Sequence, residues 1–244
     1  MGLTGRGGCS SDGCMPQLPY MQGTGPGPIT PDGCPVEFYA LLRARGEPEI
    51  VQSLAPQGAD ILELGAGTGR VTHPLVELGY KVVAVDESPD MLAHIKGAET
   101  VCSPIETLLL HSTFDIVTLM SFLVEIPDED LMRGFLRTCR THVRDNGYVV
   151  LERHTPGWHD TASTYERTNE LGHRISMREL SRPAPGLVSA SVEYRVGDSV
   201  WTHSYQTRHL DDDRLERELT AAGLVFDRFL TDDQRWIAAR PRPS

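Results

Sequence analysis

The stretch ILELGAGTGR, residues 61–70, joins a continuous apolar run directly to three glycines at alternate positions, Gly65, Gly67 and Gly69. A continuous apolar run is typical of a strand that is buried on both faces of a parallel sheet. Glycine has no Cβ and tolerates positive φ, so a glycine-rich turn allows a ligand to approach the backbone. The pattern therefore predicts a buried strand that ends in a ligand-binding turn.

Similar apolar runs recur along the chain and alternate with helical patterns. The runs that predict strands lie at 60–64, 81–86, 114–123 and 148–152. Helical patterns occupy the intervening segments 70–79, 88–97 and 127–143, and two short helices are expected at 36–46 and 47–55. Alternation of strand and helix predicts βαβ units, right-handed crossovers and a doubly wound α/β sheet.

The pattern changes after Glu152. Residues 173–181, 187–196 and 199–210 alternate at period two, and the sequence Gly-Asp joins the last two segments as a hairpin signal. We expect a small three-stranded antiparallel insert within about 156–210. A helix at 211–223 and a closing pair of strands at 224–230 and 235–241 complete the chain.

The opening segment has a different composition. Gly or Pro occupies 15 of the first 35 residues, so this segment cannot bury enough surface to stay ordered on its own. We expect a flexible arm over 1–35 and one domain over 36–244. The five cysteines lack CxxC spacing and disulfide density, which predicts free thiols.

The charge distribution disfavours some partners. The net charge is −11 and the 23 Lys and Arg residues are scattered, so no basic face is available for nucleic acid or an anionic membrane. No apolar stretch approaches the ~20 residues of a membrane span, and the N-terminus lacks a secretory signal pattern. We expect a cytoplasmic protein, monomeric or homodimeric, with a small-molecule substrate.

The residues around the glycine turn discriminate between ligands. A dinucleotide fingerprint, GxGxxG, would require a third glycine where Arg70 stands. Glu63, two residues before the turn, would repel a pyrophosphate but attract a cationic or amino-bearing ligand. Asp86, 17 residues after Gly69 at the end of the second strand, is placed to accept both hydroxyls of a ribose. S-adenosylmethionine fits this set of requirements, and the missing third glycine argues against NAD.

The ordered series of segments resembles the class I S-adenosylmethionine-dependent methyltransferases. LELGAGTGR is similar to the first motif of that family, VVAVDES to the second, CSPIETL to the adenine loop, FDIVTLMSFLVEIP to the fourth motif and LRTCRTHVRDNGYVVLE to the fifth. The resemblance runs through residues 36–155. It implies a Rossmann-like, seven-stranded, mostly parallel sheet with an antiparallel strand at the edge.

The resemblance also implies a set of cofactor contacts. Glu63 would hold the methionine amino group, Asp86 the ribose, and the glycine turn would pass beneath the methionine part. Ser103 stands where many members have an acid that bonds the adenine amino group. The full expected set is Tyr39, Glu63, Gly65, Ala66, Gly67, Thr68, Gly69, Asp86, Glu87, Ser88, Met91, Ser103, Pro104, Ile105, Glu106, Met120, Ser121 and Phe122.

Residues at the end of the fifth strand are candidates for catalysis. The carboxyl ends of strands face the ligand crevice in a doubly wound sheet, so Glu152 and His154, two apart, project toward a substrate if the strand runs to 154. His154 is the first candidate for a general base, with Glu152 as the second catalytic candidate. No metal is expected, because His154 and His159 lie in a loop broken by Pro and Gly without a third ligand at short range.

Further residues are candidates for contact with the acceptor, with packing or a solvated surface as the alternative role for each. Glu125 ends the fourth-strand segment, and the insert offers alternating side chains on its strands. The candidates are Glu125, Arg174, Trp201, His203 and Tyr205.

Three functions remain open on the sequence. The leading one is transfer of the methyl group of S-adenosylmethionine to an N, O or C nucleophile of a small molecule, with S-adenosylhomocysteine as product. An isomerase, cyclase or decarboxylase that binds the same cofactor without transferring its methyl group would show the same cofactor motifs. A nicotinamide dehydrogenase is the third.

Overall fold

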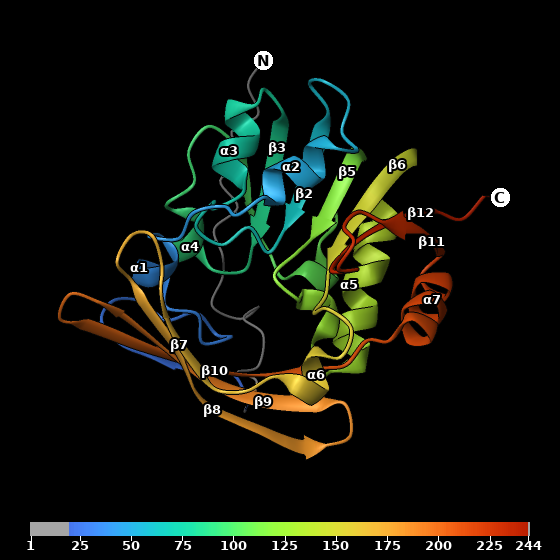
Figure 1. The fold of residues 1–244 in the computed structure, drawn as a ribbon. Coiled ribbons are helices and arrows are strands. Elements are labelled where there is room, and N and C mark those ends of the chain that lie inside the picture. The colour runs from blue at the N-terminus through green and yellow to red at the C-terminus, as the bar shows by residue number, and fades with distance from the viewer. Residues whose placement is uncertain (1–19, 244) are drawn as a thin grey trace.

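A computed structural model describes residues 20–243, which form two sheets with helices around the larger one (Figure 1). The larger sheet has seven strands in the order β11-β12-β6-β5-β2-β3-β4. Its strands are β2 (Asp60–Leu64), β3 (Lys81–Asp86), β4 (Glu99–Cys102), β5 (Phe114–Leu119), β6 (Val143–Glu152), β11 (Leu224–Phe229) and β12 (Trp236–Pro241).

The seven-stranded sheet confirms the expected fold class. Strand β2 pairs in parallel with β3 and with β5, and β6 pairs in parallel with β5. Strand β12 is antiparallel to both of its neighbours, so the antiparallel strand lies one position inside the edge that β11 forms. Strand β4 was not identified from the sequence, because its four residues Glu-Thr-Val-Cys form no apolar run.

Helices cover both faces of this sheet. Side chains of α2 (Glu47–Gln52) and α3 (Thr72–Glu77) share one buried cluster with Ile61 and Ile116. Those of α5 (Glu129–His142) and α7 (Asp212–Ala221) share the cluster on the other face. Leu62 and Leu64 of β2 belong to this second cluster, whereas Ile61 belongs to the first. Successive residues of one strand therefore enter opposite cores, as a strand buried on both faces requires.

The second sheet lies across the carboxyl ends of the central parallel strands (Figure 1). It has five strands, not the expected three, in the order β1-β10-β9-β8-β7. They are β1 (Gln22–Thr24), β7 (Tyr165–Thr168), β8 (Arg174–Ala184), β9 (Leu187–Val196) and β10 (Ser199–Arg208). The expected hairpin is present, since Ser199 and Val196 are paired across the turn.

The N-terminal part of the described chain is ordered by this second sheet. Strand β1 pairs antiparallel with β10, and the Trp201 indole N–H donates a hydrogen bond of 2.8 Å to the carbonyl of Pro26. The segment from residue 20 therefore gains its order from a neighbouring strand, which its own composition could not reveal. Residues 1–19 of the expected arm lie outside the described chain.

Short elements complete the fold around the sheets. They are α1 (Val36–Tyr39), α4 (Pro89–Leu92), α6 (Trp158–Thr161) and the 3₁₀ turns η1 (Ile105–Thr107) and η2 (Leu123–Glu125). Helix α1 packs Phe38 into the core of the second sheet. No helix within residues 20–243 is long and apolar enough to cross a membrane.

Leu151 provides a test of the shared core. It is fully buried in β6 between β5 and β12, so Leu151→Ala is expected to lower the free energy of unfolding by about 2–5 kcal/mol. The matched control is Leu109→Ala, because Leu109 is 74% exposed; its expected effect is within about 0.5 kcal/mol. Denaturant unfolding measures both, and equal effects would contradict this packing.

Candidate active site

A cavity of about 480 Å³ lies between the seven-stranded sheet and the second sheet. One wall comes from the carboxyl ends of β2, β3 and β5, and the opposite wall from β7, β8, β9 and β10. A third wall comes from the segment before α1, which contributes Thr30, Asp32 and Cys34. In a doubly wound sheet this edge is where ligands bind.

The glycine turn after β2 forms the floor of the cavity. Gly65 and Gly67 have φ values of 72° and 56°, a backbone conformation that residues other than glycine rarely adopt. The Gly67 N–H donates a hydrogen bond of 2.8 Å to Asp86 Oδ2. A Cβ built on Gly67 would meet no heavy atom within 4 Å, so open space lies directly beside the backbone. The turn thus has both the shape and the free volume for a ligand.

Three carboxyl groups surround this turn, and burial raises the pKa of each. Burial raises the pKa of Glu63 to about 7, although a hydrogen bond of 2.6 Å from the Thr72 hydroxyl partly opposes the shift. Burial also raises the pKa of Asp86 to about 6, although hydrogen bonds from the N–H groups of Ser88 and Gly67 stabilise its carboxylate and partly oppose the shift. Burial and neighbouring acids raise the pKa of Glu87 to about 7. These groups favour a cationic ligand.

Most of the expected cofactor contacts line the cavity. Besides the glycine turn and these acids, they are Tyr39, Ala66, Thr68, Met91, Pro104, Ile105, Glu106, Met120, Ser121 and Phe122. Gly69, Ser88 and Ser103 are not among the lining residues. Ser88 instead caps α4 by accepting from the Met91 N–H, and the Ser103 hydroxyl donates to the carbonyl of Pro104, at 2.9 Å.

The turn after β5 is held in an uncommon backbone conformation. The sequence predicted a strand through residue 123, but β5 ends at Leu119, and Ser121 and Phe122 have φ values of 56° and 63°. Glu152 Oε2 accepts a hydrogen bond of 2.7 Å from the Ser121 N–H, and Oε1 accepts one of 2.8 Å from Arg235 Nε. Both oxygens of Glu152 are therefore engaged with this turn and with Arg235.

His154 lies beside the cavity in a fixed orientation. Its ring stacks between Phe122, with ring centroids 4.0 Å apart, and Trp158, at 3.6 Å. Its Nδ1 lies 2.5 Å from Oε2 of Glu125, which is 2% exposed. A carboxylate only accepts hydrogen bonds, so in the neutral form of the imidazole this contact places the proton on Nδ1 and leaves Nε2 as an acceptor. The structure thus joins Glu125, expected to contact the acceptor, with the expected base.

His159 lies behind His154, away from the cavity lining. The two ring centroids are 5.4 Å apart in an edge-to-face arrangement, and His159 is 3% exposed. Burial lowers the pKa of His159 to about 4, so its imidazole is neutral near pH 7. Within the described residues, neither its Nε2 nor Oε1 of Glu125 has a hydrogen-bond partner.

The expected acceptor contacts divide into two groups. His203 and Tyr205 of β10 line the cavity, as does Glu125. Trp201 does not, because it packs into the core of the second sheet beside Phe38 and bonds Pro26. Arg174 is also absent from the lining. Its Nε lies 3.8 Å from Oε1 of Glu166, which belongs to the neighbouring strand β7.

Sequence reasoning missed several lining residues. Tyr165, Arg167 and Tyr194 come from the second sheet, and Asp32 comes from the segment that was expected to be flexible. Tyr194 alternates with Val192 along a strand that was recognised, so its position on the inner face could have been inferred. Asp32 and Tyr165 carry no such signal, because Asp32 follows β1 and Tyr165 begins β7, two strands that the sequence pattern did not reveal.

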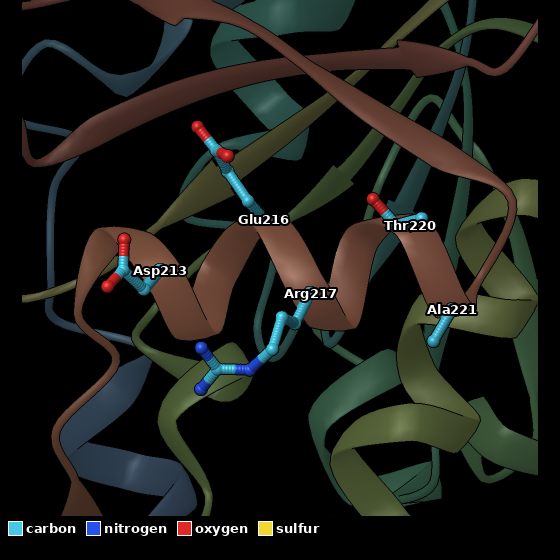
Figure 2. A pocket seen from close by; sticks show the side chains of 5 residues that line it. All are labelled: Asp213, Glu216, Arg217, Thr220 and Ala221. Carbon is cyan, nitrogen blue, oxygen red and sulfur yellow. The ribbon is translucent and has the colours of Figure 1, made fainter.

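A second hollow, beside α7, is lined only by that helix (Figure 2). Its residues are Asp213, Glu216, Arg217, Thr220 and Ala221, and the labelled Glu216 and Arg217 point to opposite sides of the helix. Because no other element contributes a side chain, this hollow is an open surface depression rather than an enclosed site.

Comparison with known proteins assigns the family. A family model described as a methyltransferase domain matches residues 39–225, which is more than half of the chain. The chain belongs to this methyltransferase family. The fold class, family and enzyme class predicted from the glycine turn and the following motifs are thereby confirmed.

Individual relatives of this methyltransferase are similar over shorter segments. An uncharacterised methyltransferase of Mycobacterium tuberculosis is 45% identical over 67 residues, covering 27% of this chain and 28% of that protein. A cypemycin N-terminal methyltransferase of a Streptomyces species is 32% identical over 142 residues, covering 51% of this chain and 56% of that protein. The chain therefore spans between about a quarter and about half of the length of these relatives.

A solved structure shows the same fold. The S-adenosylmethionine-bound amino pentose methyltransferase of Micromonospora echinaspora is 19% identical, has a TM-score of 0.65, and the match covers 80% of this chain and 88% of that one. That protein binds S-adenosylmethionine, which is the cofactor that the sequence of this chain predicts.

The raised pKa values predict a pH-dependent affinity. Near pH 5, Glu63 holds a proton and cannot attract the ammonium of S-adenosylhomocysteine, so affinity should rise between about pH 5 and about pH 8 as Glu63, Asp86 and Glu87 ionise. Glu63→Gln should flatten this rise and weaken binding mainly at the higher pH. Calorimetry with the exposed Glu77→Gln as control measures the effect; an unchanged profile in Glu63→Gln would exclude Glu63 from ligand binding.

Proposed function

We propose that this methyltransferase moves the methyl group of S-adenosylmethionine to an N, O or C nucleophile of a small molecule. The observation that carries the proposal is one cavity in which a left-handed glycine turn with its acids faces the pair formed by Glu125 and His154. One end suits a cationic nucleoside ligand, and the other offers a proton acceptor.

The residues present fit the cofactor. The open volume beside Gly67 leaves room for a ligand against the backbone. Within the described residues, Oε2 of Glu87 and Oε2 of Glu106 are buried without a hydrogen-bond partner, so polar groups of a ligand can supply the missing partners. Asp86 would hold the ribose hydroxyls and Glu63 the ammonium. When bound, S-adenosylmethionine supplies a methyl group on a positively charged sulfur.

The chain's own residues then align the acceptor and exclude water. Methyl transfer is an in-line displacement, so correct placement of the nucleophile supplies much of the rate. Met120, Ile105 and Phe122 form an apolar part of the cavity wall. His154 would accept the proton of the nucleophile at Nε2, and Glu125 would stabilise the resulting imidazolium through Nδ1. Glu152 would position the turn that carries Phe122 rather than accept a proton.

The second sheet would bind the acceptor. Tyr205, Tyr194 and His203 place aromatic surface and polar atoms on the cavity wall opposite the glycine turn. A cavity of about 480 Å³ that also has to hold the cofactor leaves space for a small molecule. The net charge of −11 gives no support for a nucleic-acid acceptor.

The test measures methyl transfer directly. The protein is incubated with S-adenosylmethionine and panels of amines, hydroxyl compounds and activated carbon acids. We expect release of S-adenosylhomocysteine together with an acceptor heavier by one methylene. A cofactor-dependent change of the acceptor without that release would instead support an isomerase, cyclase or decarboxylase.

His154→Ala tests the base. With the acceptor that the screen identifies, we expect turnover to fall about 10²–10⁴-fold, since general-base catalysis contributes on that order, while affinity for S-adenosylhomocysteine is retained. The exposed His111→Ala is the matched control. Unchanged turnover in His154→Ala would show that His154 is not the base.

A further inference from the structure

The loop after β6 brings together three side chains whose donor atoms suit a metal ion. Glu125, His154 and His159 each offer one ligand atom, and these atoms all lie within 4.8 Å of one another. His154 and His159 are close in sequence, but Glu125 is 29 residues before His154, after a different strand. A third candidate ligand is therefore distant along the chain but close in space.

We propose that Glu125, His154 and His159 bind a divalent transition-metal ion, with Zn²⁺ as the best match. Two imidazoles and one carboxylate form a donor set of zinc sites that keep a fourth position open. Magnesium and calcium prefer oxygen ligands, so they match this set poorly.

Two buried atoms without partners support the site. Oε1 of Glu125 and Nε2 of His159 have no hydrogen-bond partner among the described residues, and both residues are at least nine-tenths buried. A buried polar atom without a partner is destabilising, and a bound cation would satisfy both at once. The surrounding rings of Phe122 and Trp158 restrict movement of His154, as is useful for a ligand.

Little movement is needed to form the site. Two donors that are each about 2.1 Å from a tetrahedral zinc ion lie about 3.4 Å apart. The 2.5 Å contact between His154 Nδ1 and Glu125 Oε2 would have to widen by about 0.9 Å, and separations of up to 4.8 Å would have to shorten by at most about 1.4 Å. Glu125 and His154 line the cavity and His159 does not, so an ion would be reached from the cavity side.

The inference does not depend on the proposed function, but it limits when that function operates. Nδ1 of His154 is the nitrogen beside Glu125, so an ion held between these residues would bind Nδ1. The neutral imidazole would then carry its proton on Nε2, and Nε2 could not accept another in that state. If His154 is the base, the metal-bound form is the less active one. The ion would then act as an inhibitor that competes for the base.

The test uses Co²⁺ as the probe. The full-length protein is treated with a chelator, the chelator is removed, and Co²⁺ is titrated while visible absorption is recorded. We expect one equivalent to produce the intense d–d bands of a tetrahedral ion, Zn²⁺ to abolish them, and excess Mg²⁺ to leave them unchanged. Absence of the bands together with no calorimetric binding of Zn²⁺ would overturn the proposal.

Two variants of His159 locate the ion. Loss of a residue that only hydrogen-bonds to a metal ligand typically costs about 10–100-fold in metal affinity. Loss of a direct ligand should cost at least as much, so His159→Ala and His159→Gln should each weaken Co²⁺ binding at least about 100-fold. The exposed His94→Ala should bind as the unmodified protein does. If either His159 variant bound Co²⁺ as tightly as the unmodified protein, the ion would lie elsewhere and the proposal would be overturned.

A cofactor titration separates this inference from the proposed function. S-adenosylhomocysteine binding shows that each variant is folded, since His159 lies outside the cavity lining. Cofactor binding without Co²⁺ binding would refute the metal site and leave the methyltransferase proposal intact. Co²⁺ binding without cofactor binding would support the metal site and refute the methyltransferase proposal.

Discussion

The hydrogen bond from the Gly67 N–H to Asp86 joins the ends of β2 and β3, and the geometry of the site depends on it. It fixes the left-handed turn next to the strand that carries Asp86, so two neighbouring strand ends form one surface. The cost is a partly dehydrated carboxyl group whose pKa rises to about 6. A ligand with hydroxyl donors and a positive charge relieves that cost, whereas a pyrophosphate would increase it.

The same principle organises the cavity wall around His154, where each buried acid is stabilised by specific partners. Glu125 is paired with His154, and Glu152 is paired with Arg235 and the Ser121 N–H. Each pair connects segments far apart in sequence. Together with the stacked rings of Phe122, His154 and Trp158, they fix one face of the cavity before any ligand arrives. Preorganisation of this kind reduces the entropy lost when the substrate is aligned.

Sequence reasoning predicted which residues come together where they belong to neighbouring elements of the chain. The glycine spacing, Glu63 and Asp86 lie within one βαβ unit, so their pattern predicts their geometry. It failed where strands from distant segments meet. Strand β1 is short and glycine-rich, and β7 is exposed along its whole length, so neither shows the alternation that reveals a strand. The contact of Glu125 with His154 also depends on β5 and β6 being neighbours, which no local pattern shows.

The most direct test of the central claim is calorimetric titration of S-adenosylhomocysteine into the unmodified protein, Asp86→Ala and the exposed control Asp90→Ala. Hydrogen bonds to a charged group contribute about 1.5–3 kcal/mol, so Asp86→Ala should weaken binding by about 10–100-fold while Asp90→Ala binds normally. No binding to the unmodified protein, or equal binding to Asp86→Ala, would contradict the assignment of the glycine turn to this cofactor.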